Sequence, residues 1–92
     1  LDEQLQIRGN RILVVEDEAL VAIALCDMLR ECGFEIVGPC STVSEALGLI
    51  RAVKFDAAVL DVNLNGEMIY PAAELLAERG IPFVFMTGYS LE

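Results

Sequence analysis

The sequence predicts an α/β fold built on a doubly wound parallel sheet. Two observations support this prediction. Short, β-branched apolar runs alternate along the chain with helical segments, and polar residues follow directly after several of these runs. The 92 residues suffice for one domain and not for two, and a hydrophobic content of 55% can form a continuous core.

The amino-terminal part predicts a buried strand followed by a helix. Arg11–Val15 is a short apolar run, and a helix is expected from Ala19 to about Cys32, where Gly33 ends it. The spacing of its apolar residues predicts a buried stripe made of Val21, Ala24, Leu25, Met28 and Cys32.

The next segment predicts a peripheral strand and a second helix. Glu35–Cys40 contains Pro39, which is tolerated in strands at the border of a sheet. Thr42 and Glu45 form a capping box that begins a helix fading near Val53. The inward residues of that helix are expected to be Val43, Ala46, Leu47 and Ile50.

The remaining segment predicts two more strands with a helix between them. A third buried strand covers residues 56–60, and a polar loop follows from Asp61 to Gly66. A helix with Pro71 in its first turn then runs to Arg79. Residues 81–86 are the predicted fourth strand.

Polar side chains follow three of the predicted strands. Glu16 and Asp17 follow the first strand, Asp61 the third and Thr87 the fourth. Ligands bind outside the carboxyl ends of parallel strands, so we expect these side chains to converge. Clustered carboxylates repel one another unless a cation lies among them, and Mg²⁺ or Mn²⁺ prefers such oxygen ligands.

Each of these residues has a possible chemical role. Asp17 and Asp61 can each supply a carboxylate oxygen to the metal, Asn63 its backbone carbonyl, and Glu16 can act through water. Asp61 opens an exposed loop, which makes it the better nucleophile toward a phosphoryl group, and the Thr87 hydroxyl can bind a phosphoryl oxygen. Taken singly, the acids before the first helix can also be explained as helix caps.

Three segments together resemble the CheY-like receiver domain of two-component response regulators: residues 12–18, 55–66 and 82–88. The resemblance implies a flavodoxin-like fold with strand order 2-1-3-4, completed in the family by a fifth strand. Residues 85–88 are similar to a subgroup with a Phe-Ala-Thr-Gly signature, in which Met86 replaces the alanine.

The resemblance implies that Asp61 is the phosphorylation site and that Thr87 and Gly88 contact the phosphate and act as the switch. The phosphoryl donor would be a phosphohistidine on a sensor histidine kinase or a histidine phosphotransfer protein. Such a domain is no enzyme toward other substrates and catalyses only its own phosphorylation and dephosphorylation. The kinase is expected to dock on the first helix, where Ala22, Ile23 and Cys26 form either a docking surface or a face buried under neighbouring elements.

The resemblance also predicts the domain organisation. Residues 1–92 are expected to form a single receiver domain with an extension over residues 1–10. Its last β/α unit, with the family's lysine, is expected to be missing from the chain. A sheet ending at the fourth strand would leave Val84 and Phe85 poorly covered, and a homodimer is one way to cover them.

Charge and composition exclude several other classes of protein. A net charge of −9 argues against direct binding to nucleic acid, and no apolar run is long enough to span a membrane. We therefore expect a cytoplasmic domain. Three cysteines without paired spacing, and no histidine, make a zinc site improbable.

Two other functions remain as alternatives. One is an aspartyl-nucleophile phosphatase of the haloacid-dehalogenase kind, which needs an acid where Asn63 stands. The other is a receiver-like scaffold that binds its partner without phosphorylation.

Overall fold

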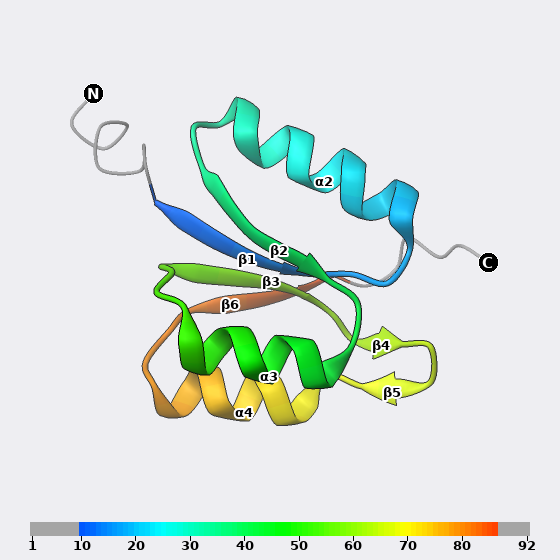
Figure 1. Ribbon diagram of the computed structural model, residues 1–92, viewed down its shortest axis with the longest axis vertical. Helices are drawn as coiled ribbons and strands as arrows, with labels where there is room; N and C mark the ends of the chain where they lie inside the picture. The colour runs from blue at the N-terminus through cyan, green and yellow to red at the C-terminus, as the bar shows by residue number, and fades with distance from the viewer. Residues whose placement is uncertain (1–9, 87–92) are drawn as a thin grey trace.

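Four parallel strands form the central sheet in the computed structural model, which describes residues 10–86 (Figure 1). The strands lie in the order β2-β1-β3-β6, with every neighbouring pair parallel. Their bounds are β1 Arg11–Val15, β2 Glu35–Cys40, β3 Ala57–Asp61 and β6 Phe83–Met86. This confirms the predicted order, because β6 is the fourth strand of the prediction.

Three helices cover the two faces of this sheet. Helix α2 (Ala19–Glu31) lies on one face, and α3 (Val43–Ala52) and α4 (Tyr70–Glu78) pack side by side on the other (Figure 1). The arrangement is doubly wound, as predicted. Within residues 10–86, no helix combines the length and the apolar character needed to cross a membrane.

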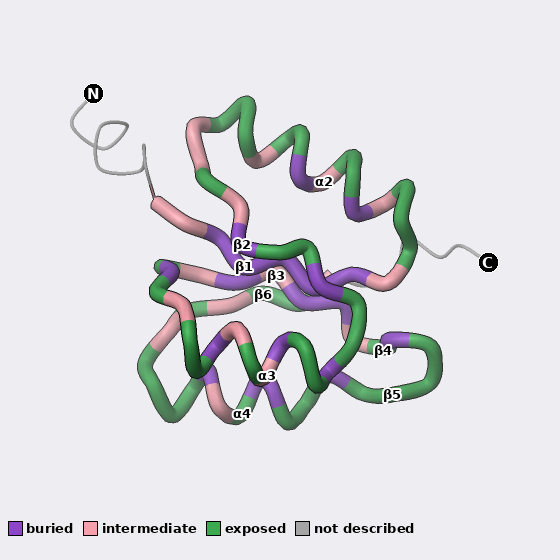
Figure 2. The backbone as a smooth tube through the Cα atoms, in the orientation of Figure 1, coloured by how far each residue is buried: buried purple, intermediate pink, exposed green. Residues whose placement is uncertain are grey.

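The core divides into two layers because successive side chains of a strand point to opposite faces. Leu13 and Val15 of β1 face the layer formed with α3 and α4, whereas Ile12 and Val14 face α2. All four side chains are buried, so β1 lies at the centre of the molecule (Figure 2). Helix α3 buries Val43, Ala46 and Ile50, as its spacing predicts.

The predicted buried stripe of α2 is wrong. Ala22 and Cys26 are its buried residues, whereas Ala24, Met28 and Cys32 of the predicted stripe are exposed. The helix is apolar on nearly all sides, so the spacing could not identify the face that packs on β1. Ala22 and Cys26 of the predicted docking surface are only 5% and 3% exposed, which agrees with the alternative that they are buried under neighbouring elements.

Ile23 is the one residue of that predicted surface that lies exposed, at 58%. Leu20 and Met28 of the same helix are also exposed. Val84 and Phe85 of β6 are exposed at 59% and 42%, in agreement with the expectation that they are poorly covered.

A small antiparallel hairpin replaces the predicted loop after β3. Strands β4 (Asn63–Leu64) and β5 (Glu67–Met68) pair through a two-residue turn. Asn65 and Gly66 adopt φ angles of 55° and 93°. An Asn-Gly pair with positive φ at both residues is typical of a tight hairpin turn. This dipeptide was the signal in the sequence that could have predicted the hairpin.

The predicted helix ends are present with one difference in detail. The Glu45 backbone N–H donates to the Thr42 hydroxyl oxygen at 3.0 Å, as a capping box requires. The Glu45 carboxylate accepts from the Ser41 backbone N–H at 2.9 Å, one residue before the expected donor. Gly33 ends α2 with a φ of 96°.

Candidate functional site

Glu16, Asp17 and Asp61 come together at the carboxyl ends of β1 and β3. Val15 of β1 pairs in register with Leu60 of β3, so the residues that follow them lie side by side. One carboxylate oxygen from each of the three acids lies within 4.8 Å of the other two. The predicted convergence of these three side chains is therefore found in the structure.

The cluster is buried on its inner side and open at Asp17. Glu16 and Asp61 are only 3% and 7% exposed, whereas Asp17 is half-buried. The Glu18 backbone N–H donates to Glu16 Oε2 at 2.9 Å, and the Asn63 backbone N–H lies 3.4 Å from Asp61 Oδ1. Among the described residues, no buried side-chain nitrogen or oxygen lacks a hydrogen-bond partner. The acids are thus held in place by their surroundings.

A side-chain cap by Glu18 is not present at the start of α2. Glu18 occupies the N-cap position of α2, yet its side chain makes no capping hydrogen bond, and the first turn contains no acidic residue. Glu16 is fixed from a different side, because its backbone N–H donates to the Cys40 carbonyl at the end of β2 at 2.9 Å. The arrangement favours a shared ligand over a cap.

The hairpin orients the backbone of Asn63. Hydrogen-bonded and non-bonded pairs alternate along an antiparallel ladder. The Ile69 N–H donates to the Val62 carbonyl at 3.0 Å, so the next pair, Asn63 with Met68, is a non-bonded one. The Asn63 carbonyl therefore points away from β5 and is available to a ligand beside Asp61.

The donor set fits a hard divalent cation. All the available atoms are oxygens, and Mg²⁺ binds oxygen at about 2.0–2.1 Å, so opposite ligands lie about 4 Å apart. The three carboxylates span a similar distance. Without a cation, three negative charges at this spacing repel one another.

Thr87 and Gly88 are the remaining predicted site residues. They lie outside the described residues, and Met86, which pairs in register with Asp61, is the last residue before them. Lys54 precedes β3, so it lies at the opposite edge of the sheet from the acids.

The fold and this acidic edge are those of a signalling receiver domain. Residues 12–92 match the family model described as the response regulator receiver domain, and the chain belongs to this family.

Individual relatives agree with this assignment. PdtaR, a transcriptional regulatory protein of Mycobacterium tuberculosis, is 40% identical over 82 residues, which cover 88% of this chain and 40% of PdtaR. The solution structure of SdrG from Sphingomonas melonis Fr1 is 49% identical with a TM-score of 0.82, and the match covers 89% of this chain and 70% of SdrG. The response regulator PhyR from Brucella abortus is 30% identical with a TM-score of 0.78, and the match covers 91% of this chain and 36% of PhyR.

Proposed function

We propose that this receiver domain accepts a phosphoryl group on Asp61 in a reaction that requires Mg²⁺ or Mn²⁺. The donor is the phosphohistidine of a sensor histidine kinase or a histidine phosphotransfer protein. One observation carries the proposal: Glu16, Asp17 and Asp61 bring carboxylate oxygens within 4.8 Å of one another at the carboxyl edge of the sheet. Parallel α/β sheets bind their ligands at this edge.

Each residue of the site has a distinct part in this reaction. Asp17, Asp61 and the Asn63 carbonyl would hold the cation, and Glu16 would orient one of its waters. The bound cation supplies positive charge that lets a phosphate approach the acids. An Asp61 carboxylate oxygen attacks the phosphorus, the bond from phosphorus to the histidine nitrogen breaks, and the imidazole leaves. Water later attacks the same phosphorus and releases inorganic phosphate.

We propose that Thr87 and Gly88 contact the phosphoryl group from its other side. The Thr87 hydroxyl would donate to a phosphoryl oxygen, and the Gly88 backbone would approach the same group closely because glycine has no side chain. Phosphorylation would thereby draw the end of the fourth strand toward Asp61. This movement is the switch that we assign to the domain.

The phosphatase alternative is weaker. An aspartyl-nucleophile phosphatase needs an acid two residues after its nucleophile to protonate the leaving group. Asn63 stands in that position and has no acidic proton to give. A scaffold that is not phosphorylated does not explain why three acids lie together at one edge of the sheet.

Acetyl phosphate with Mg²⁺ provides the test. The Asp61 carboxylate would displace acetate from acetyl phosphate, and intact mass spectrometry would detect one added phosphoryl group. Asp61→Asn and excess EDTA should each abolish the adduct. Asp27→Asn is the matched control, because Asp27 is exposed on α2 and makes only a surface ion pair with Arg30. The same adduct on the Asp61→Asn protein would overturn the proposal, and rapid turnover of phosphate monoesters would favour the phosphatase.

The chain spans about 40% of the length of PdtaR. We propose that residues 1–92 act as a single receiver unit in the cytoplasm, where a phosphohistidine donor made from ATP is available. Ile23 is the exposed part of the predicted docking surface, and we propose that the kinase contacts it there.

A further inference from the structure

We propose that a cavity at the amino edge of the sheet, opposite the acidic site, binds a small organic anion. The ligand would carry a phosphate or carboxylate group attached to an apolar portion. The cavity has a volume of about 390 Å³, within the range of about 300–1,000 Å³ that is usual for small-molecule sites. Arg11, Lys54 and Arg79 are the basic residues among those that line it.

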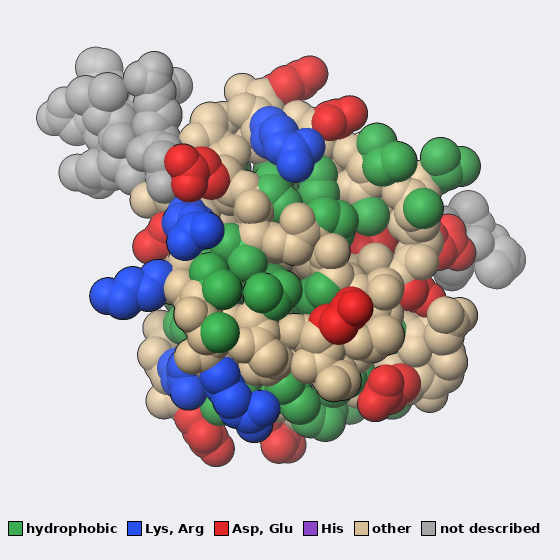
Figure 3. Space-filling view, viewed as in Figure 1, with side chains coloured by type: hydrophobic (Ala, Val, Ile, Leu, Met, Phe, Trp, Pro, Cys, Tyr) green, Lys and Arg blue, Asp and Glu red, His purple; other side chains and the backbone are tan. Residues whose placement is uncertain are grey.

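The charge of the cavity contrasts with that of the chain. The protein has 15 acidic and 6 basic residues, yet half of the basic ones line this single cavity. Lys and Arg side chains gather at the left and lower left of the molecule, over the amino ends of the strands (Figure 3). Asp56 is the one acid in the lining, and Glu35 pairs with Arg11 beside it, so three basic residues stand against two acids. An anion is the ligand that this balance attracts.

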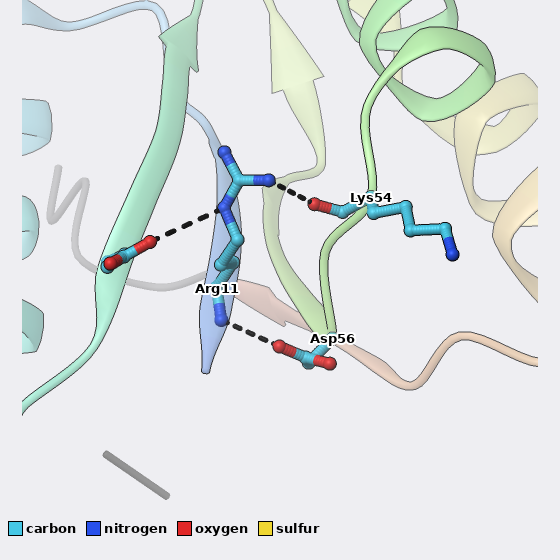
Figure 4. Close-up of polar contacts among 4 residues, drawn as sticks. Arg11, Lys54 and Asp56 are labelled. Atoms are coloured by element: carbon cyan, nitrogen blue, oxygen red, sulfur yellow. Dashed lines mark hydrogen bonds and ion pairs between the residues drawn. The ribbon is translucent and has the colours of Figure 1, made fainter. Parts of the chain in front are cut away.

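Two of the cations are held in place by the backbone. Arg11 Nη1 donates to the Lys54 carbonyl at 2.7 Å, and the Arg11 backbone N–H donates to Asp56 Oδ2 at 2.7 Å (Figure 4). Glu35 lies 3.5 Å from Arg11 Nε as an exposed ion pair. Arg79 Nη1 donates to the Ile50 carbonyl at 3.0 Å. A guanidinium group has five N–H donors, so these contacts fix both arginines and use only part of their capacity.

Lys54 and the apolar lining complete the site. The Lys54 side chain extends away from Arg11 and is exposed (Figure 4). Ile50, Val53, Phe55 and Ile81 line the rest of the cavity. Sites for small molecules commonly combine such an apolar surface with a few fixed polar groups. A ligand with an anionic group and an apolar portion satisfies both parts.

A purely structural role is the competing explanation. Helices α3 and α4 end at this edge, and cations near helix carboxyl ends stabilise them. This explains the contact between Arg79 and the Ile50 carbonyl. It predicts no affinity for an anion and no effect of Lys54, whose side chain is exposed, on ligand binding.

Titration with phenylphosphonate separates the two explanations. Its phosphorus is bonded to carbon and cannot be transferred to Asp61, and the absence of added Mg²⁺ keeps the acidic site out of the measurement. Amide resonances of residues 53–56 and 79–81 in ¹H–¹⁵N spectra should shift and saturate. Lys54→Met should weaken binding about tenfold, because it removes one charge-assisted hydrogen bond.

Arg30→Gln is the matched control, because Arg30 is an exposed cation on α2, on the other face of the sheet. It should leave the affinity unchanged, and inorganic phosphate should bind more weakly than phenylphosphonate because it does not contact the apolar lining. Shifts that do not saturate, or equal affinity in the Lys54→Met protein, would overturn the proposal. Equal affinity for inorganic phosphate would show that the ligand needs no apolar portion.

Discussion

Asp17 shares its edge of the sheet with two buried acids. When no cation is present, repulsion among the three negative charges lowers the free energy of unfolding. Asp17→Asn should raise the free energy of unfolding in EDTA, since it removes one of three repelling charges. Asp17 is half-buried and partly screened by solvent, so we expect a gain of about 1 kcal/mol. Urea unfolding provides the measurement. Asp27→Asn should change stability by no more than about 0.5 kcal/mol, and a destabilised Asp17→Asn protein would contradict the repulsion.

The three cysteines should differ in their reactivity with iodoacetamide. Burial raises the pKa of the Cys40 thiol to about 11, with a smaller contribution from the negative charge of Glu45, and burial also raises the pKa of Cys26. Thiolates are the reactive species, and Cys32 is the exposed thiol. Intact mass spectrometry at mildly alkaline pH should therefore show a single rapid adduct, which peptide mapping assigns to Cys32. Three adducts should form in urea, and equal native rates would contradict the burial of Cys26 and Cys40.

Glycine-to-alanine substitutions in the hairpin turn and in helix α3 test how backbone conformation affects stability. Gly66 has a φ of 93°, and a Cβ atom there would meet nothing within 4 Å, so only the backbone opposes Gly66→Ala. We expect a loss of stability of about 1 kcal/mol. Gly48 lies inside α3, and a Cβ atom there would also meet nothing within 4 Å. Gly48→Ala should therefore stabilise the protein by about 0.5–1 kcal/mol.

Urea unfolding of both variants measures this difference of sign. Gly66→Ala should also slow phosphorylation by acetyl phosphate, because the turn sets the direction of the Asn63 carbonyl. Gly48→Ala should leave that rate unchanged. Loss of stability in both variants would mean that crowding, and not backbone conformation, determines the outcome.

The strands and the acidic site were predictable for the same physical reason. Strands buried on both faces have continuous apolar sequences, as in Arg11–Val15, and a polar residue marks the point where such a strand leaves the core. Parallel strands bring those points to one edge, so the sequence alone predicts that Glu16, Asp17 and Asp61 lie together. The register of β1 and β3 then fixed how close the acids are.

Other features depend on contacts that the spacing of apolar residues in the sequence does not reveal. Helix α2 is apolar on several sides, so the choice of Ala22 and Cys26 over Met28 is made by the sheet against which it packs. The hairpin has strands of two residues, too short to show an alternating pattern. The basic cavity combines Arg11, Lys54 and Arg79, which are far apart in the sequence and adjacent only in the fold.

The whole molecule has opposite charges at the two edges of its sheet. The acidic cluster lies at the carboxyl edge, and the basic cavity lies at the amino edge, with the strands of the core between them. The chain as a whole carries a net charge of −9, so like charges repel across most of its surface. Two kinds of cation effect are therefore expected: general screening of this repulsion and specific binding at the acids.

Comparison of NaCl with MgCl₂ at equal ionic strength separates these two effects. Screening should raise the free energy of unfolding in both salts, because it weakens the repulsion of the whole surface. Binding of Mg²⁺ to the folded protein adds a further term, which is about 2.7 kcal/mol when its concentration is a hundred times the Kd. Asp17→Asn and Asp61→Asn should lose this excess and keep the response to NaCl, whereas Asp27→Asn should keep both. Equal stabilisation of the unsubstituted protein by the two salts would show that its acids bind no cation, and the proposed phosphorylation would then lack the positive charge on which it depends.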